Sequence, residues 1–118
     1  MNDLQTSAEP KLSMILAGRV DPTMSFSEKV WAVCSRVPAG KVTTYAAIAR
    51  ELGCRAPRAV GQALHRNPHA PRVPCHRVVA TNGALTGYAG GLSKKQRLLE
   101  AEGVEIIAGR VVKRCMVG

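Results

Sequence analysis

Residues 43–66, TTYAAIARELGCRAPRAVGQALHR, decide the fold because they contain two short helical segments separated by a tight turn. A threonine, Thr43 or Thr44, can cap the first helix, and Gly53 is suited to end it. Pro57 fits the first position of the second helix, which we expect to run to the end of this stretch. Two short helices joined by a turn that contains glycine are typical of a helix-turn-helix.

The second helix of this pair carries small residues in its middle, Ala59, Gly61 and Ala63. A glycine inside a helix costs about 1 kcal/mol relative to alanine, so its presence favours the close approach of another group to the backbone. That group could be a neighbouring helix. Alternatively, the helix could enter a narrow groove of DNA, with Arg58 projecting near its N-terminal end. Periodicity alone does not choose between these interpretations.

Upstream of the pair, the sequence predicts another helix. Ser25 and Glu28 have the spacing of a capping box, and valines then recur at helical intervals as far as the segment 38–40, Pro-Ala-Gly, which is expected to end the helix. Cys34 falls on the apolar face of this helix. It is therefore expected to be a small core residue and not a reactive thiol.

Downstream of the pair, three prolines between Asn67 and Pro74 forbid regular structure and hold the chain extended. A short strand is expected from Val78 to Ala80. Residues 93–96, Ser-Lys-Lys-Gln, have capping-box spacing and predict a last helix to about residue 102. Residues 104–113 predict a terminal hairpin. The predicted fold is mainly α (α+β), a winged-helix-like helix-turn-helix domain with short strands or a small C-terminal hairpin.

At 118 residues, the chain is long enough for one small domain. Residues 1–24 show no sustained period, so we expect a loosely ordered N-terminal arm, with a short helical turn near residues 12–17, and a single domain over 25–118. No signal peptide and no stretch long enough to span a membrane is visible. With four cysteines far apart and no Cys-x-x-Cys pair, a cytoplasmic setting with free thiols is expected.

The charge balance points to a polyanionic partner. The chain has 17 basic and 8 acidic residues, a formal net charge of +9 and an isoelectric point of about 10.0. The basic residues concentrate between Arg50 and Arg77 and again between Lys94 and Arg97. This distribution favours nucleic acid as the partner over an anionic membrane, while simple surface solvation is the alternative.

The segment Pro74-Cys75-His76-Arg77 places a thiol directly beside an imidazole. Cysteine attacks as its thiolate, and a neighbouring base or positive charge makes the thiolate accessible near neutral pH. Cys75 is therefore the candidate nucleophile. A buried structural cysteine is the alternative, because the Cys-His pair alone is a weak signal.

This segment, together with Val78, the preceding Asn67-Pro68 and the following residues 87–92, resembles the active-site region of the O6-alkylguanine-DNA alkyltransferases, also called methylated-DNA–protein-cysteine methyltransferases. The resemblance continues through residues 37–45, 58–61 and 98–103. It therefore covers about residues 25–107, with several ordered motifs at the family's spacing.

The resemblance implies a reaction and roles for five residues. Cys75 would take the alkyl group from O6 of a damaged guanine as a thioether that is not reversed, so that each molecule acts once. His76 would relay the thiol proton through a water to Glu102. Tyr45 would donate a proton to the leaving guanine and crowd the DNA phosphate. Asn67 would hold the turn between the recognition helix and the cysteine loop.

The resemblance also implies how double-stranded DNA containing O6-alkylguanine is bound. Arg58 would fill the gap that the flipped nucleotide leaves, and the helix-turn-helix would enter the minor groove, so binding should be mainly electrostatic and sequence-tolerant. The residues assigned to DNA binding are Arg58, Thr44, Ala59, Gly61 and Arg66. Those assigned to the substrate pocket are Tyr88, Ala89, Val78, Lys95 and Pro74.

Three departures from the family bear on these expectations. Larger members carry an N-terminal domain, sometimes with zinc, whereas about 24 residues precede the similar region here, so neither a metal nor a cofactor is expected. Ala89 stands where many relatives have a small hydroxyl or a charged residue. The tail from Glu102 to Arg114 resembles the alkyltransferase-like proteins, which bind alkylated guanine without removing the alkyl group and usually have Trp in place of the cysteine.

Two alternatives to alkyl transfer therefore stay open. The first is a damage-binding protein of the alkyltransferase-like kind, against which the presence of Cys75 argues. The second is a helix-turn-helix transcription regulator with an incidental cysteine. It is disfavoured because the second helix has few side chains suited to read bases and because regulators are generally dimers, whereas a monomer is expected here.

Overall fold

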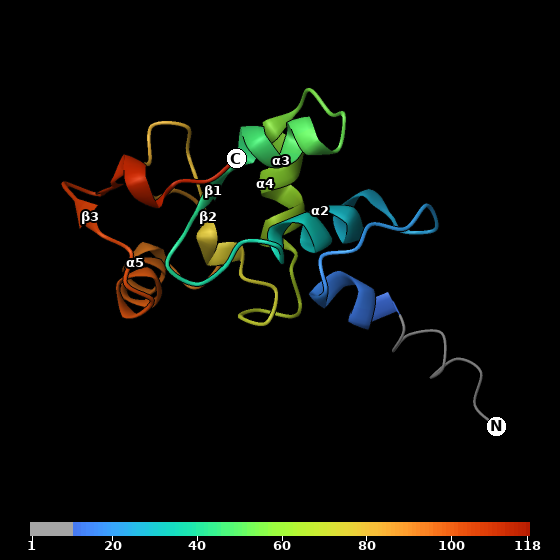
Figure 1. Ribbon diagram of the computed structural model, residues 1–118, viewed down its shortest axis with the longest axis horizontal. Helices are drawn as coiled ribbons and strands as arrows, with labels where there is room; N and C mark the ends of the chain where they lie inside the picture. The colour runs from blue at the N-terminus through green and yellow to red at the C-terminus, as the bar shows by residue number, and fades with distance from the viewer. Residues whose placement is uncertain (1–10) are drawn as a thin grey trace.

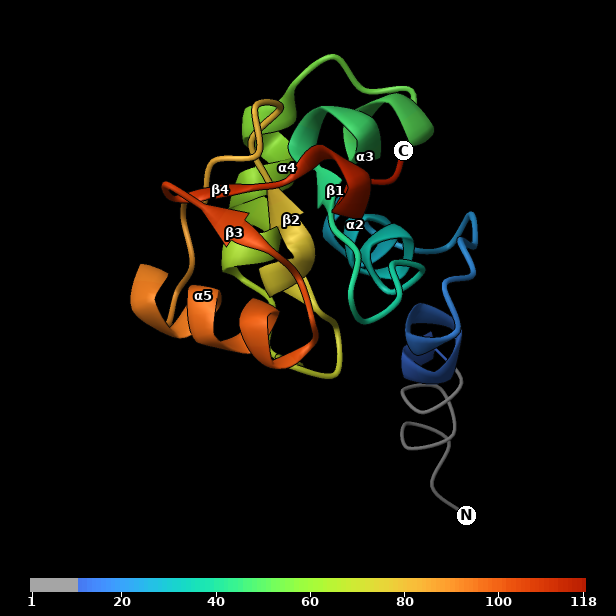
Figure 2. The same ribbon diagram turned by 60° about the vertical axis from the view of Figure 1, so that its left-hand side comes forward.

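The computed structural model describes residues 11–118 of the chain (Figures 1 and 2). Its named helices and strands are, in order, α2 (Phe26–Cys34), β1 (Thr43–Thr44), α3 (Tyr45–Glu51), α4 (Pro57–His65), β2 (Val78–Val79), α5 (Leu92–Ala101), β3 (Ile106–Ile107) and β4 (Arg110–Val111). Two single 3-10 turns accompany them, η1 (Cys75–Arg77) and η2 (Lys113–Cys115). This mostly helical architecture with small strands confirms the predicted α+β helix-turn-helix fold.

The described part of the expected N-terminal arm is packed, not loose. Residues 11–16 are helical, where a helical turn was expected, and residues 1–10 lie outside the described residues. Ile15 is 2% exposed and Met24 is 5% exposed, and both belong to the main apolar cluster. The sequence concealed this packing because two buried side chains nine residues apart produce no sustained period.

Helix α2 begins as predicted and ends early. Ser25 Oγ accepts a hydrogen bond from the Glu28 N–H at 3.2 Å, and Glu28 Oε1 accepts one from the Ser25 N–H at 2.8 Å, which completes the capping box. The helix stops at Cys34 and not at residues 38–40, because the N–H groups of Arg36 and Val37 bond three residues back and tighten the last turn. Cys34 is fully buried, as predicted.

Helices α3 and α4 form the predicted helix-turn-helix. Thr44 is the N-cap of α3, and its hydroxyl accepts from the Ala47 N–H at 3.0 Å. Pro57 occupies the first turn of α4, where its missing N–H leaves no hydrogen bond unmade. Helix α4 buries Val60, Ala63 and Leu64 against α2 and α3, and the indole of Trp31 donates to the Ala63 carbonyl at 2.8 Å.

The two strand pairs join distant parts of the chain. Strand β1 runs parallel to β2, with Thr43 opposite Val78 and Thr44 opposite Val79, a pairing that no local signal predicts. The terminal hairpin is confirmed, with β3 and β4 antiparallel and shorter than the range expected for it. Its two-residue turn has positive φ at Ala108 and Gly109, 53° and 77°, as a turn compatible with strand twist requires.

The start of α5 corrects the sequence prediction. The N-cap is Gly91, with no side-chain cap, and Ser93 lies inside the helix, so the predicted capping box at residues 93–96 is wrong. The Lys95 N–H bonds to the Gly91 carbonyl at 3.1 Å and closes the first turn. This register turns the Lys95 side chain inward, where it is 0% exposed.

The core consists of two apolar clusters that meet at β2. One gathers residues 11–24 and helices α2 to α4, and the other gathers α5, the hairpin and the tail. Val78 belongs to the first cluster and Val79 to the second, because successive side chains of a strand point to opposite faces. The turn η1, which precedes β2, therefore lies where the two clusters join. Within residues 11–118, no helix is long and apolar enough to cross a membrane.

Candidate functional site

Cys75 lies at the start of η1, held from both sides by hydrogen bonds. Its N–H bonds to the Val73 carbonyl at 2.8 Å, and the Arg77 N–H bonds to the Pro74 carbonyl at 2.9 Å. Pro74 and Val73 are buried, whereas Cys75 is half-buried. The backbone around the thiol is thus fixed while its side chain stays accessible from one side.

The loop before Cys75 is closed by Asn67. Its Nδ2 donates to the Val73 carbonyl at 2.9 Å, and its Oδ1 accepts from the His69 N–H at 2.8 Å. One amide side chain therefore ties the end of α4 to the residue two positions before the cysteine. These bonds are the geometry that the expected turn-holding role requires.

His76, Arg77 and Glu102 form one hydrogen-bonded network. The Nε2 of His76 lies 3.0 Å from Oε2 of Glu102, so the bridging water expected between these two groups is not needed. Arg77 donates to both carboxylate oxygens of Glu102, with Nε to Oε1 at 2.9 Å and Nη2 to Oε2 at 2.6 Å. Its Nη1 reaches the Val37 carbonyl at 2.7 Å. The carboxylate is held by a two-point ion pair and faces the imidazole.

The network sets the protonation of both titratable partners. Burial lowers the pKa of His76, and this effect outweighs the hydrogen bond to Glu102, so the imidazole is neutral near pH 7. Burial raises the pKa of Glu102, but the hydrogen bonds from Arg77 and His76 outweigh it and hold that pKa below its usual range. A carboxylate at Nε2 favours a proton on Nε2. The Nδ1 atom is then the free base, and it is buried without a hydrogen-bond partner among residues 11–118.

A second set of polar contacts lies around the fully buried Lys95. Its Nζ donates to the carbonyls of Val78 and Thr86, both at 2.7 Å, and lies 5.9 Å from the centre of the Tyr45 ring. Burial lowers the pKa of Lys95 to about 8. The Tyr45 hydroxyl donates to the Thr86 carbonyl at 3.0 Å and accepts from the Thr86 hydroxyl at 3.4 Å. Burial raises the pKa of Tyr45 and outweighs the hydrogen bond from the Thr86 hydroxyl, which lowers it. Tyr45 and Lys95 therefore converge on one carbonyl.

A groove of about 460 Å³ runs along α4. It is lined by Tyr45, Arg58 and Gly61, and also by Pro57, Gln62, His65, Thr86 and Gly87. Arg58 is exposed at its edge. A Cβ added to Gly61 would meet the Tyr45 ring at 3.8 Å, which is ordinary contact, so packing inside the protein does not demand a glycine there.

The structure brings some of the predicted site residues together and leaves others apart. Burial raises the pKa of Tyr88, with a smaller contribution from the charge of a Cys75 thiolate, and the ring is half-buried. Ala89 is exposed, and Arg66 is exposed at the C-cap of α4. Thr44 lies outside the α4 groove and lines a different one.

Sequence reasoning gave no role to Arg77 or Thr86. Arg77 stood in the quoted motif, and its charge beside His76 was the available signal. The part of Thr86 is played by its backbone carbonyl, which a sequence cannot reveal. No group of three or more potential metal ligands occurs in residues 11–118.

The chain is similar in sequence to known proteins. Residues 25–104 match the family profile described as 6-O-methylguanine DNA methyltransferase, DNA binding domain. The chain is 51% identical to a methylated-DNA–protein-cysteine methyltransferase of Methanosarcina acetivorans over 79 residues, 66% of this chain and 51% of that protein. It is 41% identical to the Methanosarcina mazei protein of the same name over 102 residues, 86% of this chain and 65% of that one. It thus spans between half and two thirds of these relatives.

Two solved structures share the fold. Mycobacterium tuberculosis OGT in complex with DNA superposes with a TM-score of 0.65 at 39% identity, covering 82% of this chain and 66% of that one. S. pombe Atl1, in complex with damaged DNA containing O6-carboxymethylguanine, superposes with a TM-score of 0.68 at 34% identity, covering 79% of this chain and 94% of that one.

Proposed function

Because this chain belongs to the 6-O-methylguanine DNA methyltransferase family through its DNA-binding domain, we propose that it binds duplex DNA and transfers the alkyl group of O6-alkylguanine irreversibly to its own Cys75. The observation that carries the proposal is the accessible Cys75 thiol directly before a neutral His76, whose other nitrogen is held by Glu102. Residues 25–118 would form the unit that performs both steps.

The proposed transfer is a displacement at the alkyl carbon. The Cys75 thiol gives its proton to Nδ1 of His76, directly or through a water, and Glu102 stabilises the imidazolium that results. The thiolate then attacks the alkyl carbon: the new S–C bond forms as the C–O6 bond breaks, and the electron pair of that bond leaves with guanine. The Tyr45 hydroxyl, which lines the groove along α4, would return a proton to the guanine.

DNA would be held by the exposed side of α4. Arg58 projects from its first turn, and Gly61 lines the groove without an internal reason to be small, so a narrow helix surface is available to a DNA groove. The half-buried Tyr88 and Lys95, whose Nζ lies 5.9 Å from the centre of the Tyr45 ring, would shape the pocket for the flipped base. Asn67 would keep the cysteine loop in register with α4.

The experiment is a stoichiometric transfer assay. The protein is mixed with an equimolar duplex that contains O6-methylguanine, digested and analysed by mass spectrometry. The peptide containing Cys75 should gain one methyl group, and a Cys75→Ser variant should bind the duplex without gaining it. A Cys115→Ser variant, which removes a buried thiol elsewhere, is the matched control and should still be methylated. An unmodified Cys75 peptide after complete binding would reject the transfer.

One observation favours a second candidate function, recognition of the damaged base without transfer. The structure superposes on S. pombe Atl1, solved in complex with damaged DNA containing O6-carboxymethylguanine, with a TM-score of 0.68 at 34% identity. The same assay separates the two functions, because a damage-binding protein would prefer the O6-methylguanine duplex over an undamaged one and leave Cys75 unmodified. A monomeric state and a cytoplasmic location remain predictions.

A further inference from the structure

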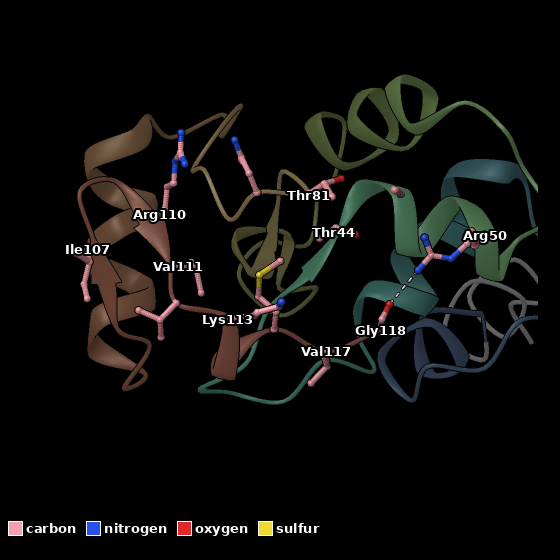
Figure 3. A pocket seen from close by; sticks show the side chains of 13 residues that line it. Thr44, Arg50, Thr81, Ile107, Arg110, Val111, Lys113, Val117 and Gly118 are labelled. Carbon is pink, nitrogen blue, oxygen red and sulfur yellow. Dashed lines mark hydrogen bonds between the residues drawn. The ribbon is translucent and has the colours of Figure 1, made fainter.

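A second and larger groove, of about 640 Å³, opens between α3, the turn at Thr81 and Asn82, and the C-terminal residues (Figure 3). Cys75 and its hydrogen-bonded neighbours do not line it. Its charged lining residues are Arg50, Arg110 and Lys113, and the uncharged polar ones are Thr44, Thr81 and Asn82. The others are apolar side chains and a glycine.

The charged side chains that line the groove are all positive. No Asp or Glu lines it, and within residues 11–118 none of Arg50, Arg110 and Lys113 forms an ion pair. Arg114, the next residue along the tail, is paired with Glu105 and does not line the groove. The one side-chain hydrogen bond among the three runs from Arg50 Nη2 to a main-chain oxygen of Gly118 at 3.0 Å, so Arg110 and Lys113 are the two of these cations with no side-chain hydrogen bond among the described residues.

The cations are presented on a fixed frame. The Val111 N–H bonds to the Gly83 carbonyl at 2.9 Å, which attaches β4 to the turn that contains Asn82. The Val117 N–H bonds to the Val42 carbonyl at 2.7 Å, which attaches the tail to the residue before β1. Arg110 directly precedes the first anchor and Lys113 lies between the two, so both side chains extend from a positioned backbone.

We propose that this groove binds the phosphodiester backbone of the DNA that flanks the lesion, which extends the contact surface beyond α4. Figure 3 shows Arg110 and Arg50 at opposite sides of the groove with Lys113 between them. Charges spread along a groove fit an extended polyanion, whereas a single small anion needs them to converge. The apolar side chains between them suit the deoxyribose faces that alternate with phosphates, and hydroxyl and amide groups are usual phosphate donors.

The two grooves are lined by consecutive residues at the start of α3. Thr44 lines this groove, and the next residue, Tyr45, lines the groove along α4. A duplex held by α4 would therefore continue past Thr44 toward Arg110 and Lys113. This inference rests on the proposed DNA binding, but it makes a separate claim about which residues contact the DNA phosphates.

The test measures the salt dependence of binding to a fluorescently labelled undamaged duplex by anisotropy. Each phosphate contact contributes about 0.9 to the slope of log K against log salt between about 50 and 200 mM. The double variant Arg110→Gln/Lys113→Gln should lose about 1.8 from that slope. The matched control Arg19→Gln/Lys29→Gln removes the same charge from residues that line neither groove and should keep the wild-type slope.

The possible outcomes separate this inference from the proposed function. If the wild-type protein binds no duplex, both the proposed function and this inference are wrong. Wild-type binding with equal slopes in the two double variants, or with an unchanged slope in the Arg110→Gln/Lys113→Gln variant, overturns the inference alone. In a further measurement, inorganic phosphate is added at constant ionic strength. If it abolishes the difference in slope between wild type and the Arg110→Gln/Lys113→Gln variant, that result would assign the groove to a small anion and would also overturn the inference. Should the double variant fail to melt cooperatively, the paired single variants Arg110→Lys and Arg110→Gln decide, since only the former should retain the slope.

Discussion

Lys95 shows how one buried charge links pH to stability. In the folded chain burial lowers its pKa to about 8, whereas an unfolded lysine has a pKa of about 10.4. Between these values the unfolded state binds more protons, so the free energy of unfolding should rise with pH, by up to about 3 kcal/mol. Below about 8 both states are protonated and the contribution of Lys95 to the slope vanishes.

The substitution Lys95→Met should abolish this rise. Urea unfolding from neutral pH to pH 10.4 should show wild type gaining stability over the variant only above about pH 8. The part of the difference in unfolding free energy that does not depend on pH reflects the Val78 carbonyl, which loses its buried hydrogen-bond donor in the variant. Lys94→Met, at the exposed neighbouring position, is the control and should run parallel to wild type. Parallel curves for both variants would contradict the prediction.

In the proposed transfer Glu102 acts through His76, so its removal should alter the pH profile as well as the rate. Glu102→Gln keeps a hydrogen-bond acceptor but removes the charge that stabilises the imidazolium and leaves Arg77 unpaired. The single-turnover methyl-transfer rate should fall by about 100-fold, a typical share of general base catalysis.

The acid limb of the same profile supplies the second readout. In wild type the rate should be constant near neutrality and fall only below about pH 6.5, the usual pKa of imidazole, since burial lowers the pKa of His76. In Glu102→Gln this limb should shift to still lower pH. The control is Glu100→Gln, exposed on the same helix. A slower reaction with an unshifted limb would mean that Glu102 serves only structure.

Among the elements, the terminal hairpin depends on one close contact. Gly83 has φ of +85°, and a Cβ there would lie 2.6 Å from the Val111 carbonyl oxygen, which is backbone and cannot yield without moving β4. Gly109, in the hairpin turn, has φ of +77° but nothing within 4 Å of an added Cβ. Because both glycines have a left-handed backbone and only Gly83 has a close neighbour, substitutions at the two positions separate the steric clash from the backbone penalty.

Gly83→Ala should therefore destabilise the protein by more than Gly109→Ala. The conformational penalty, about 1 to 2 kcal/mol, is common to both, and only Gly83→Ala adds the clash. Thermal unfolding of both variants measures the difference, and exchange of the Val111 amide reports whether β4 has detached. Equal melting temperatures and a protected amide would show that β4 tolerates the methyl group.

Local signals predicted the elements that local contacts make. Ser25, Thr44 and Pro57 begin their helices as expected because capping is decided within one turn. The capping box at residues 93–96 failed because burial of Lys95 fixed a different register. The parallel pairing of β1 and β2 escaped prediction because neither two-residue strand carries a pattern. At the site, the resemblance supplied Cys75, His76 and Glu102, while the carbonyl partners of Lys95 required coordinates.

At the level of the whole molecule, the segment before α2 contributes to the core. Ile15 is 2% exposed in the main cluster, although the sequence suggested a loose arm. Arg36 strengthens the attachment, since its Nε donates to the Gly18 carbonyl at 2.8 Å and its guanidinium pairs with Glu51. Residues 11–24 therefore cover part of the domain's apolar surface.

Ile15→Ala should lower the free energy of unfolding by about 2 to 5 kcal/mol, the range for a large aliphatic side chain removed from a core. Val20→Ala, in the same segment at a position 40% exposed, should change it by less than about 0.5 kcal/mol. Urea denaturation of both variants provides the comparison. Two equally small effects would indicate that the segment is dispensable.

Under the proposed transfer, the network around His76 would also make activity depend on the order in which the parts of the chain are synthesised. Glu102 follows His76 by 26 residues, and the Val37 carbonyl precedes Arg77 by 40. Contacts so distant in sequence form late in folding, because long loops must close first. A chain emerging from the ribosome would therefore expose a thiol beside an imidazole with no carboxylate to support it. Such a nascent chain would therefore accept an alkyl group inefficiently until His76 had met Glu102 and Arg77 had met Val37.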